Sequence, residues 1–195
     1  MTRIGIIGSG HIGGNIARFL AHGGHDVVVS FSQDQGKLDA LADAALEQAG
    51  GADALAGKAV LDTTNQFGQV GGRFGVLDLG GKSAAETNAA KAPRAAWVKA
   101  FNTLTAGFQA SSSGRTGPGR VVMFYATNAD AAAPAAEALI SDAGFDAVRT
   151  GTLARTDVGH QEPKGDLYGE EFHHDDAIAA VRRLRGTIPA GTGRP

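Results

Sequence analysis

The chain contains no cysteine, which excludes disulfide bonds, thiolate metal sites and cysteine nucleophiles. It has no stretch close to the roughly 20 apolar residues that a membrane-spanning helix needs. Neither sign of charge dominates, since 18 lysines and arginines face 20 acidic residues for a net charge of −2. There is therefore no electrostatic case for binding nucleic acid or an anionic membrane. The N-terminus lacks the pattern of a signal peptide, so we expect a cytoplasmic protein.

The composition is that of a folded domain. Of 195 residues, 43% are hydrophobic and 19% are charged, which is enough apolar material for one core with a short appendage and excludes a mostly disordered chain. The 29 glycines, together with many alanines, indicate tight turns and close packing and are typical of a high-GC bacterial protein.

Short apolar runs alternate with helical patterns along the chain. We expect strands at residues 4–7, 26–30, 58–61, 97–101, 121–125 and 147–148, with a further short strand at 76–77. Helical spacing is expected at residues 12–22, 34–48, 83–91, 130–143 and 175–184, a helix or turn at 103–110, and a flexible loop at 111–119. Ser83, with Glu86 three residues on, predicts a capping box at the start of the third of these helices. This alternation predicts an α/β fold with a doubly wound, mostly parallel sheet and helices on both faces. We expect the sheet domain to cover residues 1–151, and residues 152–195 to form an extension with one helix and a frayed tail.

A glycine-rich turn lies directly after the first expected strand and directly before the first helix. Its residues, Gly8-Ser9-Gly10-His11-Ile12-Gly13, form a G-x-G-x-x-G motif. The first glycine permits a tight turn, the second lets the backbone approach a pyrophosphate, and the third allows the helix to pack on the strand. The motif predicts a Rossmann-like dinucleotide site, and the alternative is a purely structural turn.

The end of the second strand bears on the choice of dinucleotide. NAD is selected by an acidic residue at this position, and none is present. Ser30 and Ser32 could hydrogen-bond a 2′-phosphate instead, with Lys37 as a more distant cation, which favours NADP. The alternative is that both serines only cap the next helix.

With these motifs, the chain resembles the coenzyme F420-dependent NADP oxidoreductase family. The similar segments cover residues 4–46 and 55–151. They include Ile6–Gly13, Leu61-Asp62-Thr63-Thr64-Asn65, Ser83-Ala84-Ala85-Glu86, Asp142–Asp146 and Val98-Lys99-Ala100-Phe101-Asn102-Thr103-Leu104, the last being the most specific. The resemblance implies an NADP(H)-dependent oxidoreductase that passes a hydride between nicotinamide and a deazaflavin (F420), a flavin or another small acceptor. No catalytic dyad is identified, and direct hydride transfer does not require one because positioning supplies most of the catalysis.

Three polar residues follow expected strands, where open α/β sheets bind ligands. We expect Asn65, Asn102 and Thr103 to line the nicotinamide pocket, and the alternative is that their side chains only fix loop backbones. The expected cofactor-binding residues are therefore Gly8, Ser9, Gly10, His11, Ile12, Gly13, Ser30, Ser32, Asn65, Asn102 and Thr103.

One departure from the family pattern lies between the second strand and Asp62. The family has a further strand and helix there, and about 30 residues are missing from this chain by ordinary element lengths. The loss removes a wall of the cofactor pocket and leaves a sheet edge that a second subunit could pair with, as in a homodimer. Two rival interpretations follow: a degenerate dinucleotide-binding or scaffold protein, and a repurposed enzyme of specialised metabolism.

The C-terminal segment carries a polar cluster of His160, Glu162, His173, His174, Asp175 and Asp176. Its spacing matches no zinc pattern, so we expect no metal. Asp175 and Asp176 suit the N-terminus of the last helix. The alternative is that Tyr168 or His160 acts as a proton donor on the substrate side. The partner expected for this protein is a small-molecule substrate or a second redox cofactor.

Overall fold

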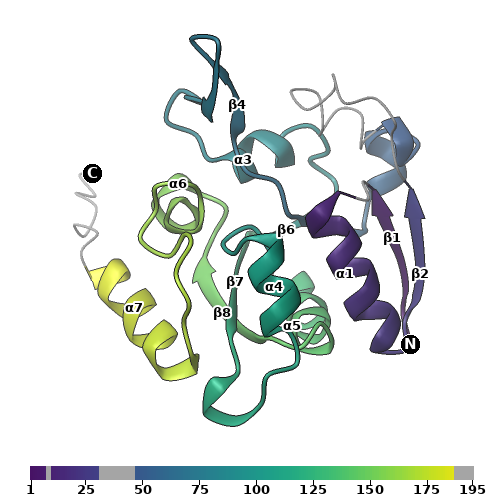
Figure 1. Cartoon of the computed structure of the whole chain (residues 1–195). Helices are drawn as coiled ribbons and strands as arrows, with labels where there is room; N and C mark the ends of the chain where they lie inside the picture. Colours follow the sequence, from purple (N-terminus) through teal and green to yellow (C-terminus); the bar gives the residue numbers. More distant parts are fainter. Residues whose placement is uncertain (8–9, 31–46, 187–195) are drawn as a thin grey trace, which may run out of the picture.

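The computed structural model describes residues 1–7, 10–30 and 47–186, which are drawn in colour in Figure 1. The strands are β1 (Arg3–Ile7), β2 (Asp26–Ser30), β3 (Ala59–Asp62), β4 (Phe67–Val70), β5 (Arg73–Val76), β6 (Ala96–Ala100), β7 (Val122–Thr127) and β8 (Asp146–Gly151). The α-helices are α1 (His11–His22), α3 (Ala84–Ala89), α4 (Ala106–Ser112), α5 (Ala133–Asp142), α6 (Arg155–Val158) and α7 (His174–Gly186). Short 3₁₀ turns are η2 (Ala52–Leu55), η3 (Gly117–Gly119), η4 (Asp130–Ala132) and η5 (Gly159–Gln161).

The main sheet has the order β3-β6-β7-β8. β3 is parallel to β6 and β7 is parallel to β8, whereas β6 and β7 are antiparallel. β1 and β2 form a separate parallel pair, in which Arg3 lies opposite Asp26 and Ile7 opposite Ser30. The predicted α/β class with a mostly parallel sheet is confirmed.

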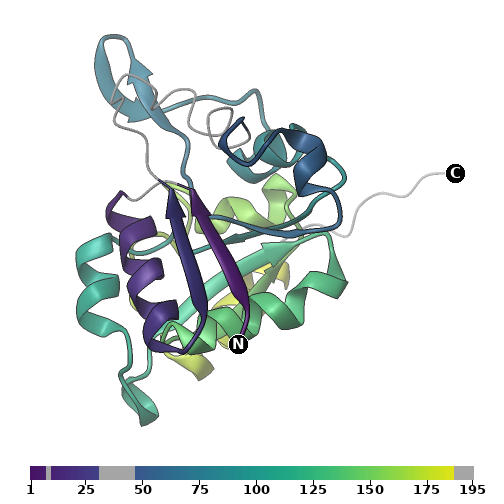
Figure 2. The same cartoon turned by 90° about the vertical axis from the view of Figure 1, so that its right-hand side faces the viewer.

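The division between the two sheets falls where the sequence departs from the family pattern. In the described part of the chain, β1 pairs only with β2, and β3 pairs only with β6. Figure 2 shows β1 and β2 standing as two adjacent arrows in front of the larger sheet. A strand lost between β1 and β3 would leave both with a free edge, as in this arrangement.

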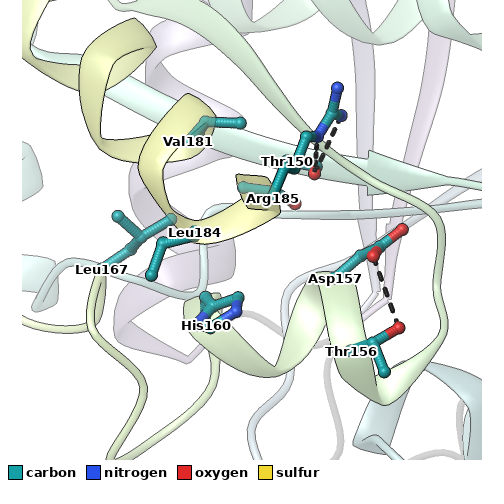
Figure 3. Close-up of a pocket in the computed structure, with 8 residues that line it drawn as sticks. All are labelled: Thr150, Thr156, Asp157, His160, Leu167, Val181, Leu184 and Arg185. Atoms are coloured by element: carbon teal, nitrogen blue, oxygen red, sulfur yellow. Dashed lines mark hydrogen bonds between the residues drawn. The ribbon is translucent and has the colours of Figure 1, made fainter. Parts of the chain in front are cut away.

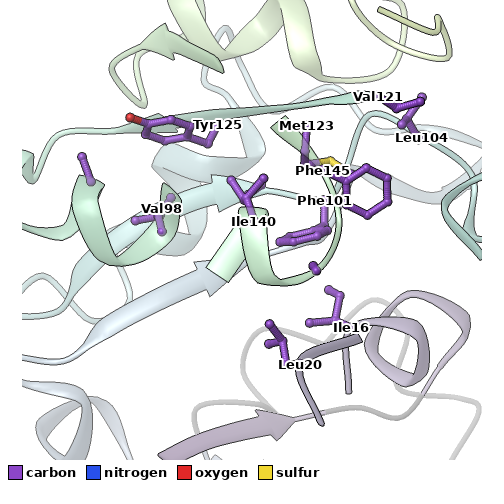
Figure 4. Packing of buried hydrophobic residues seen from close by; sticks show 14 of the residues in the cluster. Ile16, Leu20, Val98, Phe101, Leu104, Val121, Met123, Tyr125, Ile140 and Phe145 are labelled. Atoms are coloured by element: carbon purple, nitrogen blue, oxygen red, sulfur yellow. The ribbon is translucent and has the colours of Figure 1, made fainter. Parts of the chain in front are cut away.

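Alternate residues of β7 point into two different cores, because side chains of a strand alternate between faces. Met123 and Tyr125, with Val121 just before β7, belong to a cluster with α1, α5 and β6. In this cluster the rings of Phe101 and Phe145 meet edge to face, with their centroids 6.3 Å apart. Figure 4 shows these side chains with Ile16 and Leu20 of α1. Val122 and Phe124 instead pack with α7 on the opposite face. Helices therefore cover both faces of the sheet, as the sequence predicted.

The β1–β2 pair packs through one side only, against the cluster that α1, α5 and β6 form. Ile4, Ile6 and Val27 contact that cluster. Ile7, Val28 and Val29 are 39%, 50% and 42% exposed. An ordinary first strand of a doubly wound sheet is buried on both faces, so the pair has lost part of its usual cover.

Several elements differ from their predicted form. The glycine-rich stretch after Asn65 holds a two-stranded hairpin, β4–β5, where the sequence predicted one short strand. Helix α4 runs to Ser112 and so takes the first residues of the expected flexible loop. The helix predicted at residues 34–48 lies largely outside the described residues. In the described part of the chain, no helix is long and apolar enough to cross a membrane.

Candidate functional site

The described half of the glycine turn leads straight into α1. Gly8 and Ser9 lie outside the described residues. Gly10 is the N-cap, with an extended backbone, and α1 begins at His11. Among the residues the structure describes, no side chain caps this helix, and its first turn holds no acidic residue. The first-turn amides are thus free of a side-chain partner, and with the helix dipole they favour an anion.

Gly10 is not required by packing within the protein. Its φ is −61°, which any residue adopts, and in the described structure no heavy atom lies within 4 Å of the position a Cβ would take. The absence of a side chain therefore leaves open space at the start of α1. This is the space that a pyrophosphate needs if it is to approach the backbone, so the residues present fit a dinucleotide.

The remaining turn residues and the serines are placed only in part. His11 is exposed, and Ile12 and Gly13 are half-buried in the first turn of α1. Ser30 ends β2 beside Ile7 of β1, so its backbone lies next to the glycine turn. Ser32 and Lys37 lie outside the described residues, and the NADP preference stays a prediction.

The two predicted asparagines meet. Asn65 follows β3 and Asn102 follows β6. Asn65 Nδ2 donates to the Asn102 backbone carbonyl at 2.9 Å, and Asn102 Nδ2 donates to Asn65 Oδ1 at 3.1 Å. Asn102 Nδ2 also donates to the Gln161 carbonyl at 2.8 Å, while its Oδ1 is buried without a partner. The pair fixes loop backbones, and a buried acceptor remains free.

Thr103 lies apart from this pair. Its hydroxyl is 4.0 Å from the Met123 sulfur in the core, and its carbonyl accepts from Gly169 N at 2.8 Å. Phe101, just before the asparagine, has a φ of 59°, rare for a bulky residue. This kink at the end of β6 directs the Phe101 ring into the core and lets Asn102 reach Asn65 and Gln161.

The asparagine segment is tied to the glycine turn through α1. Asn15, in the second turn of α1, is buried and donates from Nδ2 to the Ala106 carbonyl at 2.7 Å. Ala106 begins α4, four residues after Asn102. Arg18 completes the contact by donating to Asn15 Oδ1 at 2.6 Å. The start of α1 and the end of β6 therefore belong to one connected part of the molecule.

Beneath Asn65 lies a buried ion pair. Lys99 is 0% exposed and its Nζ donates to Asp62 Oδ2 at 3.0 Å and to the Thr64 carbonyl. Asp62 Oδ1 accepts from Thr64 N at 2.9 Å and from Thr64 Oγ1 at 2.7 Å. Asn88 of α3 donates to Asp62 Oδ2 at 3.1 Å. The loop that carries Asn65 is held by these contacts.

The electrostatics of Asp62 follow from this setting. Burial would raise the pKa of the carboxyl group, but the positive charge of Lys99 and the hydrogen bonds from Thr64 outweigh it and hold the pKa below its ordinary value of 3.8. The carboxylate is therefore ionised at neutral pH and keeps Lys99 paired.

Glu162 is a second buried carboxylate. It is 1% exposed, and its Oε1 accepts from Ala84 N at the start of α3 at 2.7 Å. Its Oε2 accepts from Gln66 Nε2 at 3.1 Å. Ser83 caps the same helix, with Glu86 as its capping-box partner, as the sequence predicted. Glu162 thus joins the C-terminal segment to the residue that follows Asn65.

The rest of the predicted C-terminal cluster is dispersed. His160 Nδ1 lies 2.9 Å from Asp166 Oδ2, and Asp175 and Asp176 lie in the first turn of α7. No group of three metal-binding side chains occurs in the parts of the chain that are described. Burial raises the pKa of Tyr168, which disfavours it as a proton donor. Figure 3 shows the cavity beside His160, which at about 10 Å³ has room for one water molecule at most.

Sequence reasoning missed Lys99, Asp62, Gln66 and Glu162 as a polar support for the site. One signal was available: a lysine inside the apolar strand WVKAF is costly to bury unless it is paired. Its partner could not be named from spacing, since 37 residues separate the two.

Comparison with known proteins gives a family match over the N-terminal part of the chain, and a fold. Residues 3–61 match the family model of NADP oxidoreductases, coenzyme F420-dependent. A hypothetical protein from Sinorhizobium meliloti has a similar structure, with a TM-score of 0.69 and 28% identity over 90% of this chain and 97% of that one. A protein from Arthrobacter sp. FB24, named provisionally as an F420-dependent NADP-reductase, gives a TM-score of 0.62 and 22% identity over 94% of this chain and 93% of that one. No curated protein matches significantly.

The matched segment contains β1, the glycine turn, α1, β2 and most of β3, which are the elements that carry the N-terminal motifs. The predicted resemblance to the coenzyme F420-dependent NADP oxidoreductases is therefore confirmed over residues 3–61.

Proposed function

We propose that this protein is an NADP(H)-dependent oxidoreductase that transfers a hydride between the nicotinamide and a deazaflavin, a flavin or another small acceptor. The observation that carries the proposal is the open start of α1 at Gly10, where a Cβ would meet no heavy atom within 4 Å in the described part of the chain. The family match over residues 3–61 supports the same assignment.

When bound, the nicotinamide would supply the hydride chemistry, and the protein would supply position. The first-turn amides of α1 would hold the pyrophosphate. Asn65 and Asn102 would sit at the strand ends beside the cofactor, and Asn102 Oδ1 is a buried acceptor with no partner among the described residues. Ser30 and Ser32 would contact the 2′-phosphate. Because direct hydride transfer depends on orientation, the rigidity of the Asn65–Asn102 pair is the relevant property.

Isothermal titration calorimetry with NADPH and NADH tests this function. The decisive variant is Gly10→Ala, whose Cβ would meet no heavy atom within 4 Å in the described structure. We expect unchanged thermal stability and NADPH binding weakened at least about tenfold, since the backbone can no longer approach the phosphates. Gly107→Ala, at an exposed helical glycine with open surroundings, is the matched control. No saturable NADPH binding by the wild type would refute the proposal.

The divided sheet favours a second candidate, a non-catalytic dinucleotide-binding scaffold that pairs its free edges in a homodimer. β1 and β3 each lack a second neighbour in the described structure. Tight NADPH binding without turnover of deazaflavin, flavin or small carbonyl acceptors would support this candidate. Sedimentation of the pure protein measures the dimer directly.

A further inference from the structure

A groove lies between the β4–β5 hairpin and the turn that follows η5. Its apolar side is formed by Val76, Leu77 and Pro163, and its volume is about 240 Å³. This is below the roughly 300–1,000 Å³ of sites for drug-sized ligands. The groove therefore suits a small molecule with one apolar face.

Two cations and one carboxylate line the rim of the groove. Arg155 makes one long hydrogen bond, to the Lys82 carbonyl at 3.4 Å, and Lys164 makes no ion pair with any residue the structure describes. Asp78 is occupied in part, because its Oδ1 accepts from Gly80 N at 2.9 Å. The rim has an excess of one positive charge, and its two cationic groups are available to an anion.

The backbone that presents Lys164 is held in an unusual conformation. Lys164 has a φ of 76°, one of only two positive values among the described non-glycine residues. A Cβ on the next residue, Gly165, would lie 2.3 Å from the Gly159 carbonyl oxygen and 2.5 Å from that of His160. The turn is thus packed too closely for relaxation, and such conformations cluster at ligand sites.

Gln66 adds a hydrogen-bonding group to the groove. It is 6% exposed, and its Nε2 is used by Glu162, whereas its Oε1 is buried with no partner. A buried acceptor without a donor is costly. The oxygen has almost no accessible surface, so a hydroxyl or amino group on a bound molecule would satisfy it only after the Gln66 side chain turns toward the groove.

We propose that this groove binds a small organic anion with three parts: a carboxylate or phosphate for Arg155 and Lys164, an apolar body for Leu77 and Pro163, and a hydroxyl or amino donor for Gln66. Gln66 directly follows Asn65, so the groove adjoins the proposed nicotinamide site. Where the proposed function holds, and only then, this anion is the second substrate of the oxidoreductase.

Binding of meta-hydroxybenzoate, measured by ligand-observed NMR, tests the groove. Benzoate lacks the hydroxyl donor, and meta-hydroxybenzamide lacks the charge. We expect the wild type to bind meta-hydroxybenzoate about tenfold more tightly than the neutral amide, and more tightly than benzoate. Arg155→Gln and Lys164→Gln should each weaken its binding about fivefold. Arg182→Gln, an exposed charge on α7, is the control and should leave binding unchanged.

Equal binding of the anion and the neutral amide would overturn the proposal, as would equal binding by Lys164→Gln and Arg182→Gln. Lys164 is exposed, so its variant remains informative if Arg155→Gln proves unstable. Parallel titration with NADPH separates the two proposals. Binding of meta-hydroxybenzoate without binding of NADPH refutes the oxidoreductase function and leaves the groove, whereas the reverse refutes only the groove.

Discussion

Replacing Lys99 with methionine is expected to destabilise the protein by about 3 kcal/mol. Removing one partner of a buried ion pair costs about 3–5 kcal/mol, because the other charge is left uncompensated. Methionine keeps most of the aliphatic packing. Asp62 retains three donors, Thr64 N, Thr64 Oγ1 and Asn88 Nδ2, which places the expected cost at the lower end of this range.

Urea unfolding followed by circular dichroism measures this change. A loss of about 3 kcal/mol corresponds to a fall in Tm of about 6–12 °C for a domain of this size. Lys58→Met, at an exposed lysine just before β3, should change stability by no more than about 0.5 kcal/mol. The double variant Lys99→Met with Asp62→Asn should lose less than the sum of the single variants, because neither partner is then left as an isolated charge.

The pH dependence gives an independent check on the same pair. The native pKa of Asp62 is lowered below 3.8, so its contribution to stability is complete above that pH and is lost as the pH falls through the native pKa. The difference between the wild type and Lys99→Met should therefore narrow below about pH 4. A Lys99→Met variant that loses less than about 1 kcal/mol, with no coupling to Asp62, would refute the reasoning.

Three further predictions concern other parts of the structure. Gly165→Ala should lower the free energy of unfolding by more than about 2 kcal/mol, because its Cβ would lie 2.3 Å from a backbone oxygen. Gly75→Ala, whose Cβ would have contacts of 3.5 Å or more, should lower it by about 1 kcal/mol or less. Equal losses in urea unfolding would contradict this. Glu162→Gln should lower the free energy of unfolding by about 1–2 kcal/mol, since it removes the negative charge at the start of α3. Unchanged stability would show that the hydrogen bond to Ala84 N needs no charge. Burial raises the pKa of both Tyr125 and Tyr168, so the native protein should give less phenolate absorbance near pH 10 than the unfolded chain. Stability should fall as the pH rises from there, and equal phenolate absorbance of the native and unfolded protein at about pH 10 would contradict the structure.

The candidate site was predicted in part. Asn65 and Asn102 were expected together because both follow strands of one sheet, and they form a reciprocal hydrogen-bonded pair. Thr103 shares their sequence context, but its hydroxyl lies against Met123 in the core. Phe101, which precedes both Asn102 and Thr103, has a positive φ, and no local pattern predicts a left-handed phenylalanine.

The sequence by itself determined the local features of this protein. These features depend on residues a few positions apart, so spacing and residue type were sufficient to predict them. They are the positions of most strands and helices, the glycine turn before α1, and the capping box of Ser83 and Glu86.

The tertiary structure alone decided the long-range contacts. Lys99 finds Asp62 across 37 residues, and Glu162 reaches the start of α3 across 78. The division of the sheet into β1–β2 and β3-β6-β7-β8, with β6 and β7 antiparallel, belongs to the same class. These features depend on how elements pack in space, and the free energy of burying each charge is balanced only by a partner that the fold brings to it.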